Sequence, residues 1–349
     1  MTRSTTFFKS ASILACAAAV AFSASALAWA AEATSENNKR LKAALQKYPA
    51  ADANKDGVLT LTEAKAHLDA RRAKQGGGRD NAGNHSLAQF EAMEKTDAGL
   101  WVASTGHSLV APAMRPFAAI TRDAGYEGHV GVKQISGGAT GAPLAQWQRT
   151  GDRQIMKPAL ALGKWDVMTL GTHIVGSEVE DFGRWIELGL KHNPKMIFYI
   201  QDVWPRLTDM IKDGQFQLES YEEKMDYVNA FVAKRVDALN KQFGNRVFVI
   251  PVGNGMRELV RMQQAGNLPG IDAIYVSKNN EGDRVGLYRD SIHPSGPVAQ
   301  MEGYIYFACI YKKNPAEVPG PGVKDAQLDK ILRQVAWKMV TEHPHSGVK

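Results

Sequence analysis

Residues 100–110 of the chain read LWVASTGHSLV, an apolar run that passes into a polar turn. The run 100–104 predicts a buried strand, and residues 112–124 predict the helix that follows it. Ser108 would lie on the turn between them, where the N–H groups of a helix N-terminus favour negative charge. A serine at such a place is either a nucleophile or only a cap of the helix. The stretch DSIHPS at residues 290–295 favours the nucleophile, because it would supply a base and a group that orients the base.

Further along the chain, apolar and β-branched runs alternate with amphipathic stretches. The predicted strands are residues 100–104, 129–135, 166–170, 196–200 and 246–250. The predicted helices are residues 112–124, 179–191, 221–243, 256–264, 298–311 and 325–342. This alternation is typical of a parallel sheet covered on both faces. It predicts an α/β protein with a flavodoxin-like three-layer α/β/α domain over residues 99–345, built on a five-stranded parallel sheet.

Polar residues and glycines follow several of these strands. In parallel α/β folds, ligands bind beyond the carboxyl ends of the strands. We therefore expect a site formed by residues at or just past those ends, namely Ser108, Gly137, Gly138, Gly171, Thr172, His173, Gln201, Asp202 and Trp204.

The composition is that of a globular protein with an export signal. Of the 349 residues, 44% are hydrophobic and 22% are charged, which is ordinary for a globular domain. Arg3 and Lys9 precede an apolar run over residues 13–27, and Ala28-Trp29-Ala30 fits a cleavage site. Residues 1–30 therefore predict a signal peptide and a secreted or periplasmic protein. A membrane span is the alternative, but the run is short and no stop-transfer charges follow it.

The net charge and the cysteines narrow the class of protein further. Loss of the signal with its two basic residues lowers the formal net charge from +6 to +4. The chain has no basic stripe with interleaved aromatic residues, so we expect no nucleic acid partner. Cys309 lies in an apolar run and is expected in the core. Cys16 leaves a lipoprotein as an alternative, although the residues before it match a lipobox poorly.

Residues 36–74 predict a small helical unit around an EF-hand-like calcium loop. Residues 52–63 read DANKDGVLTLTE, which matches the spacing D-x-[DN]-x-[DN]-G-x5-E. The ligands would be oxygens, which Ca²⁺ prefers, and Gly57 permits the sharp turn. The predicted ligands are Asp52, Asn54, Asp56, Val58 (through its carbonyl), Thr60 and Glu63.

The calcium would be structural, and two questions about this loop stay open. No second loop of this kind occurs in the sequence, so the hand is either complete by itself or pairs between molecules. The alternative is a loop that keeps the shape and binds the ion weakly. Residues 75–98 predict a flexible linker after this unit, because QGGGRDNAGN at residues 75–84 is rich in glycine.

Four separated motifs resemble those of the SGNH hydrolase superfamily, the GDSL-type esterases. They are Gly106-His107-Ser108-Leu109, Gly137-Gly138, Gly171-Thr172-His173 and Asp290-Ser291-Ile292-His293. The resemblance covers roughly residues 99–315. It implies Ser108 as nucleophile, His293 as general base and Asp290 as the carboxylate that orients it. It also implies an oxyanion hole formed by the N–H groups of Ser108 and of Gly137 or Gly138.

The chain departs from the family pattern at two positions. His107 stands where the family has an aspartate before the serine, and it would keep a loop hydrogen bond or line the pocket. His173 stands where the family has an asparagine, and Ile174 follows it in place of an aspartate. His173 would donate an N–H to the oxyanion, which is worth about 2.7–4 kcal/mol of barrier for one such donor, or would only line the pocket.

These residues together predict a secreted serine esterase that acts through an acyl-enzyme without a catalytic cofactor. The expected partner is an acylated small molecule or polysaccharide, with acetyl esters of carbohydrates as the expected substrates. Trp147, Gln201 and Trp204 are the candidate substrate contacts; each tryptophan would stack on a sugar or pack a loop. The alternatives are an acyltransferase with the same triad and a non-catalytic, calcium-dependent carbohydrate-binding module.

Overall fold

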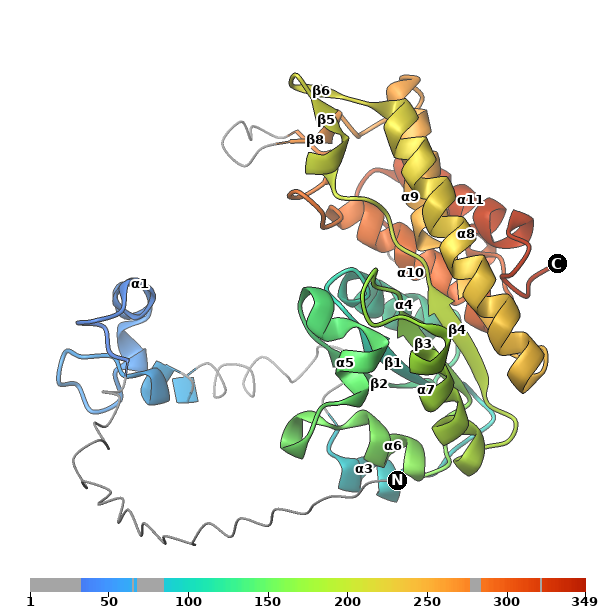
Figure 1. Cartoon of the computed structure of the whole chain (residues 1–349). Helices are drawn as coiled ribbons and strands as arrows, with labels where there is room; N and C mark the ends of the chain where they lie inside the picture. Colours follow the sequence, from blue (N-terminus) through green and yellow to red (C-terminus); the bar gives the residue numbers. More distant parts are fainter. Residues whose placement is uncertain (1–32, 65, 68–84, 277–283, 321) are drawn as a thin grey trace, which may run out of the picture. The chain divides into compact units, whose positions relative to one another are not determined.

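The computed structural model describes residues 33–64, 66–67, 85–276, 284–320 and 322–349. The chain divides into two compact units, residues 1–79 and residues 80–349. The larger unit is a sheet with helices on both faces (Figure 1). The predicted signal peptide and the glycine-rich run at residues 75–84 lie outside the described residues.

Five parallel strands form the central sheet of the larger unit, in the order β2-β1-β3-β4-β7. Their bounds are β1 Trp101–Gly106, β2 Val130–Ile135, β3 Val167–Gly171, β4 Ile197–Gln201 and β7 Val247–Ile250. The three-layer fold and its five predicted strands are confirmed. Because all five strands run in the same direction, their carboxyl ends lie along one edge of the sheet.

Strand side chains alternate between two hydrophobic cores, one on each face of the sheet. On β1, Val102 packs into one core, whereas Trp101 and Ala103 pack into the other. Both faces are covered, so every residue of β1 is buried. This explains why the sequence shows a continuous apolar run at this strand and not an alternation of apolar and polar residues.

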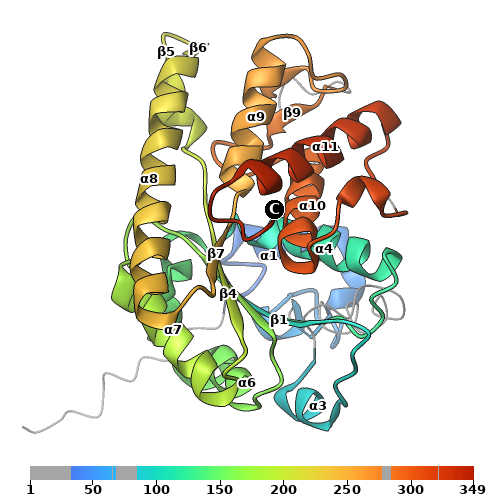
Figure 2. The same ribbon diagram turned by 90° about the vertical axis from the view of Figure 1, so that its right-hand side faces the viewer.

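The helices divide between the two faces as Figure 2 shows from the side. The first core lies under α4 (Ala111–Asp123), α9 (Val252–Gln264), α10 (Gly296–Tyr311) and α11 (Ala326–Glu342). The second lies under α5 (Pro143–Trp147), α6 (Met156–Ala161), α7 (Val179–His192) and the C-terminal half of α8 (Leu218–Phe243). The six predicted helices are all present. Cys309 is fully buried in α10, as expected.

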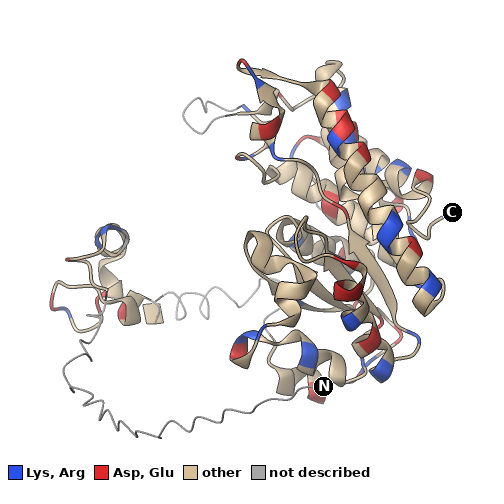
Figure 3. Ribbon diagram, in the orientation of Figure 1, with Lys and Arg blue, Asp and Glu red and all other residues tan. Residues whose placement is uncertain are grey.

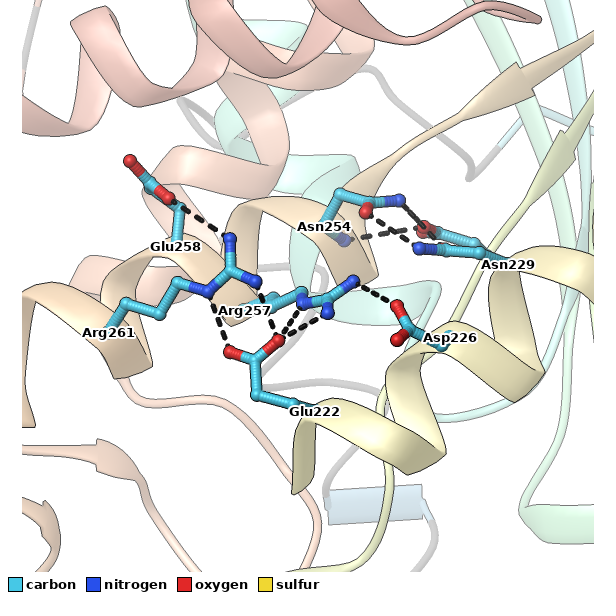
Figure 4. A network of polar contacts seen from close by, with 8 residues as sticks. Glu222, Asp226, Asn229, Asn254, Arg257, Glu258 and Arg261 are labelled. Carbon is cyan, nitrogen blue, oxygen red and sulfur yellow. Dashed lines mark hydrogen bonds and ion pairs between the residues drawn. The ribbon is translucent and has the colours of Figure 1, made fainter. Parts of the chain in front are cut away.

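A polar network joins α8 to α9 (Figure 4). Glu222 of α8 accepts hydrogen bonds from Arg257 and from Arg261, the latter at 2.6 Å from Nη2 to Oε2. Arg257 also pairs with Asp226, with 2.7 Å between Nη1 and Oδ1. Acidic and basic residues lie side by side along α8 in Figure 3, and this network uses part of them. Its outer pairs are solvent-exposed, since Asp226 and Arg261 are 69% and 49% exposed, and such pairs add little to the free energy of unfolding.

One predicted boundary is wrong, because residues 87–92 form helix α3 inside the region assigned to the linker. Phe90 of α3 is buried and its ring contacts those of Trp101 and Trp165. The larger unit therefore begins before residue 99. A sequence signal was available, since Ser86 and Gln89 form a capping box at the start of this helix.

Four short strands were not anticipated. A hairpin of β5 (Ile211–Lys212) and β6 (Gln215–Phe216) follows β4, and β8 (Ala273–Tyr275) pairs in parallel with β9 (Gly286–Tyr288). Strands of two or three residues are too short to give a periodic signal.

A short turn separates β9 from the helix predicted at residues 298–311. Pro294 forms a bridge with Tyr288, and α10 begins at Gly296, two residues before the predicted start. The backbone between them closes through hydrogen bonds from Arg289 N to His293 O and from Ser295 N to Leu287 O. Residues 289–295 therefore form a tight, braced turn before the helix.

The smaller unit has its own core of Leu41, Ala51 and Leu59. Helix α1 (Lys39–Lys47) and the turn η1 (Pro49–Ala51) precede the loop at residues 52–63, and residues 61–64 and 66–67, which begin within the end of the loop, are helical. Residues 65 and 68–74 of this unit lie outside the described residues. Residues 33–35 pair with this loop, since Ser35 N donates to Leu59 O and Leu61 N donates to Ala33 O.

Candidate active site

Ser108 lies in the turn between β1 and α4, at the carboxyl edge of the sheet. Two glycines allow this turn to sit close to its neighbours. A Cβ on Gly106 would come within 2.4 Å of Val110 Cγ2, and one on Gly171 would come within 3.0 Å of Gly106 Cα. The ends of β1 and β3 are therefore in close contact beside Ser108.

The structure brings Ser108, His293 and Asp290 together in one hydrogen-bonded relay. Ser108 Oγ is 2.8 Å from His293 Nε2, although the two residues are 185 positions apart. His293 Nδ1 is 2.8 Å from Asp290 Oδ2. An ionised carboxylate only accepts hydrogen bonds, so the proton of the neutral ring is on Nδ1 and Nε2 accepts from the serine hydroxyl. This is the geometry that a serine nucleophile requires.

Asp290 is held as a carboxylate by its own turn. Partial burial acts to raise its pKa, but hydrogen bonds from the backbone N–H groups of His293 and Ile292 and from the His293 ring lower it to about 2. These backbone N–H groups lie 2.8 and 3.0 Å from Asp290 Oδ1. The D-x-x-H spacing therefore fixes the carboxylate under the imidazole by local geometry alone.

A segment after β4 braces the Asp290–His293 turn from outside. Trp204 Nε1–H donates to Ile292 O at 2.8 Å, and Leu207 N–H donates to Ser291 O at 2.8 Å. Tyr288 Oη adds a longer bond of 3.3 Å to Pro205 O. The turn that carries the general base His293 is thus held to the segment after β4 by three hydrogen bonds.

This position corrects the expectation for Trp204 and Gln201, which were candidate substrate contacts. Trp204 is only 3% exposed and packs against the catalytic turn, so it is not open to a sugar. Gln201 is fully buried, and its Nε2 donates to Leu109 O while its Oε1 accepts from Tyr306. Both side chains position the backbone around the site, because their polar groups are used inside the protein.

Trp147 lies on α5 and also packs within the fold. Its ring meets that of the buried Trp185 edge-on, with 5.0 Å between centroids, and Lys157 Nζ lies 4.0 Å from its centroid. Its ring thus contacts two neighbours of the same unit, while the residue stays partly exposed.

His107 ties the nucleophile turn to the loop after β3. His107 Nε2 donates to Thr172 O at 2.6 Å, and Nδ1 accepts from Leu109 N–H at 3.2 Å. Burial lowers the pKa of His107 to about 4, so the ring is neutral near pH 7. Of the two roles that the sequence left open, the structure favours the loop hydrogen bond.

The N–H groups of Ser108 and of Gly137 or Gly138 are candidate oxyanion donors. Within the described residues none of the three donates a hydrogen bond, so all are available to a developing negative charge. Gly138, next along the chain, has φ +52°, a backbone conformation that favours glycine.

Buried amide side chains that the sequence did not single out hold this glycine turn in place. Gln146 is fully buried, and its Nε2 donates to Gly106 O and to Ser136 Oγ, both at 3.1 Å. Gln146 Oε1 accepts from Gln134 Nε2 at 2.9 Å. Nothing local in the sequence marks Gln146, because its partners come from β1 and β2 and only the fold brings them together.

His173 follows β3 and lies beside His107, with 5.9 Å between ring centroids. Its backbone N–H donates to Ser177 Oγ at 2.9 Å, and its Nδ1 lies 3.2 Å from Val175 N. Nδ1 also lies 3.3 Å from Val175 O, so both tautomers find a partner in this loop; in the one in which Nδ1 accepts from Val175 N–H, the ring proton is on Nε2. Nε2 has no partner among the described residues, which leaves it available to a ligand.

The loop at residues 52–63 carries the predicted calcium ligands in a closed turn. Asp52 accepts from Gly57 N, Asn54 from Asp56 N and Asp56 from Val58 N, and Gly57 has φ +83°. Glu63 reaches back across the loop and accepts hydrogen bonds from Ala53, Asn54 and Thr60.

The donor set of this loop fits a hard cation, because all six predicted ligands offer oxygen. Nevertheless, no three His, Cys, Asp or Glu side chains converge as metal ligands within the described residues. Among the same residues, no helix is long and apolar enough to cross a membrane.

Comparisons with known proteins give likenesses of fold only. No family model matches the chain, and no curated protein matches it. It is similar to the structure of a DUF4886 family protein from Bacteroides uniformis, at 15% identity and TM-score 0.48, covering 72% of this chain and 97% of that chain. A GDSL-like lipase from Parabacteroides merdae follows at 13% identity and TM-score 0.38, covering 63% and 99%.

A third similar structure is the periplasmic domain of a lipopolysaccharide acetyltransferase from Salmonella ser. Paratyphi A. It is 10% identical, has TM-score 0.40 and covers 72% of this chain and 98% of that chain. Identities and scores of this size assign neither a reaction nor a substrate, so any proposal for this chain has to rest on its own residues.

Proposed function

We propose that this chain is a serine esterase that hydrolyses acyl esters through Ser108, His293 and Asp290. The relay from Ser108 Oγ to His293 Nε2 at 2.8 Å, and on to Asp290 at 2.8 Å, is the observation that carries the proposal. A serine hydroxyl is a weak nucleophile until an imidazole takes its proton, and the imidazole needs a fixed tautomer. A binding module that does no chemistry has no need of this relay.

The reaction follows from these contacts. His293 Nε2 takes the proton of Ser108 as the serine oxygen attacks the acyl carbonyl carbon, and the carbonyl oxygen becomes an oxyanion. His293 then gives that proton to the leaving alcohol, and the acyl group stays on Ser108. A water molecule, deprotonated by His293, then attacks the acyl carbonyl carbon of the acyl-enzyme. The bond from that carbon to Ser108 Oγ breaks, His293 returns the proton to Ser108 Oγ, and the acid is released. Asp290 remains ionised throughout and stabilises the imidazolium.

The oxyanion is stabilised in this proposal by three donors. Two are the backbone N–H groups of Ser108 and Gly137. The buried Gln146 holds the backbone beside both, because its Nε2 donates to Gly106 O and to Ser136 Oγ. The third is the Nε2–H of His173, which replaces the usual asparagine donor of the family that the sequence resembles. Donors fixed in advance are the largest single contribution to many acyl transfers.

Hydrolysis is preferred to transfer because the relay is open to water. The side chain of His293 is 25% exposed and that of Asp290 is 45% exposed. An enzyme that passes its acyl group to another alcohol has to keep water from the acyl-enzyme. We therefore place hydrolysis first, with transfer to a sugar hydroxyl as the alternative.

The finer parts of the proposal come from the sequence. Acetyl esters of carbohydrates are the expected substrates, and export through residues 1–30 would bring the enzyme to them. In the smaller unit, Asp52, Asn54, Asp56, Val58, Thr60 and Glu63 would bind a structural calcium ion, which neutralises the carboxylates of the loop and stabilises the unit.

The test is turnover of p-nitrophenyl acetate and of acetylated polysaccharides, together with labelling by a fluorophosphonate. Wild-type protein should be labelled on Ser108, as read by peptide mass spectrometry. Ser108→Ala should lose label and turnover, by about 10³-fold or more. Ser291→Ala is the matched control, because Ser291 is in the catalytic turn but its hydroxyl is outside the relay. Label on another residue, or turnover by Ser108→Ala, would refute the proposal.

A further inference from the structure

A cavity of about 420 Å³ lies between α8, α9 and the C-terminal end of α11. Its wall is formed by side chains from residues 229–233, 254–261 and 339–345. None of the three residues of the catalytic relay lines it. Binding sites for small molecules have volumes of about 300–1,000 Å³, so this cavity is large enough to hold a ligand of its own.

A pair of asparagines holds one part of this wall in place. Asn229 of α8 and Asn254 of α9 face each other in Figure 4, and each amide Nδ2 donates to the other Oδ1 at 3.0 Å. Asn254 Nδ2 also donates to Asp202 Oδ2 at 2.9 Å, and Asp202 is buried. The cavity is therefore formed before a ligand enters, which lowers the entropy cost of binding.

The positive charges on the wall are already paired. Arg257 and Arg261 share Glu222, while Arg257 also pairs with Asp226 and Arg261 lies 3.9 Å from Glu258 (Figure 4). Proteins bind carboxylate and phosphate groups through guanidinium groups that are free to accept them. Both guanidinium groups are occupied here by carboxylates of the protein itself, so the wall does not select an anion.

Hydrogen-bonding groups on the same wall are left unused. Arg261 binds Glu222 through Nε and Nη2, and its Nη1 donates no hydrogen bond among the described residues. His343 Nδ1 accepts from His345 N–H at 3.1 Å, so the proton of the neutral ring is on Nε2, which has no partner in the same part of the chain. Burial lowers the pKa of His343 to about 4, so this ring is neutral near pH 7. The carboxylate of Glu342, also on the wall, adds an acceptor that no described residue uses.

The remainder of the wall is apolar. Ala230, Ala233, Met339 and Pro344 contribute aliphatic groups to it. A sugar ring has hydroxyl groups at its edge and C–H groups on its faces. It can therefore meet the polar and the apolar parts of this wall at the same time.

We propose that this cavity is a binding site for a neutral sugar of the size of a mono- or disaccharide. Sugar hydroxyls both donate and accept hydrogen bonds, so they can use the free N–H groups of Arg261 and His343 together with the carboxylate of Glu342. A neutral ligand also leaves the ion pairs of Arg257 and Arg261 intact. The inference does not depend on the proposed esterase, because no residue of the relay takes part in it.

The test is titration of the full chain with cellobiose, maltose and lactose, followed by saturation-transfer NMR, with inorganic phosphate and glycine as charged probes. Wild-type protein should bind at least one of these sugars with a millimolar or lower Kd, and more tightly than either charged probe. Ala233→Trp should abolish this binding, because the indole would fill the cavity. Lys234→Trp is the matched control, since it places the same ring on a neighbouring, exposed position of α8 that does not line the cavity.

A second variant keeps the test valid if circular dichroism shows that Ala233→Trp does not fold. His343→Phe keeps an aromatic ring but removes the Nε2 donor, and it should weaken sugar binding by about three- to tenfold. The inference is overturned if wild type binds none of the sugars or binds phosphate or glycine more tightly. It is also overturned if a folded Ala233→Trp keeps the wild-type affinity, or if His343→Phe keeps it where Ala233→Trp does not fold. None of these outcomes bears on the esterase, which is tested by turnover and by the label on Ser108.

Discussion

Replacing Trp204 by phenylalanine removes one of the braces on the catalytic turn and little else. The indole N–H donates to Ile292 O at 2.8 Å, one residue before His293, and the side chain is buried. The loss of this bond and of the ring atoms should lower the free energy of unfolding by about 2–3 kcal/mol. The turn would keep its backbone bond from Leu207 N to Ser291 O.

The catalytic cost follows from the same bond. A net hydrogen bond of about 1–1.5 kcal/mol restrains the His293 ring against Ser108, so its loss should reduce the equilibrium constant for forming the relay by about tenfold. We expect kcat to fall by at most that factor. KM should change by less than about twofold, because Trp204 does not contact substrate.

Trp165→Phe is the matched control for Trp204→Phe. Trp165 is equally buried and its Nε1 donates to Ala159 O at 2.7 Å, but it lies before β3, with no bond to the catalytic turn. Urea unfolding should show similar losses of stability for both variants, and p-nitrophenyl acetate kinetics should separate them. Equal kcat in the two variants would refute the bracing role of Trp204.

Three further predictions follow from other parts of the structure. Burial raises the pKa of Glu302 far above its usual value, and neither of its carboxyl oxygens has a partner in the described residues, so the folded protein holds it protonated. The unfolded chain ionises Glu302 above about pH 4.3, so the free energy of unfolding falls as the pH rises from there. In urea titrations, Glu302→Gln should therefore be as stable as wild type near pH 4 but more stable near pH 8. Parallel pH curves for the two proteins would contradict this. His173→Ala should lower kcat by about 10²–10³ with little change in KM, and His173→Asn should recover part of it, whereas a change chiefly in KM would favour pocket lining. Glu63→Ala should weaken calcium binding measured by calorimetry and leave esterase turnover unchanged; unaltered affinity would remove the calcium assignment.

The sequence alone determined the elements of the fold and the local half of the site. The structure reproduces the five predicted strands to within two residues. The signal is strongest at β1 and β3, which are buried along their whole length, and weakest at the edge strand β2, where Lys133 is exposed. The turn from Asp290 to His293 is likewise local, since the carboxylate and the ring are bonded across three residues. Phe90 shows the limit of prediction from sequence. Its short helix α3 is stabilised by contacts with Trp101 and Trp165, which are distant in sequence.

Only the tertiary structure decided which side chains face the site and which face the core. Ser108 and His293 meet across 185 positions because β1 and the turn after β9 end at the same edge of the unit. Trp204 and Gln201 follow a strand end, as a binding residue would, yet packing buries both. Glu302 lies in a helix whose residues are buried on every side, which the pattern of that helix does not show. Periodicity records which face of an element is apolar, but the partner that covers this face comes from distant parts of the chain.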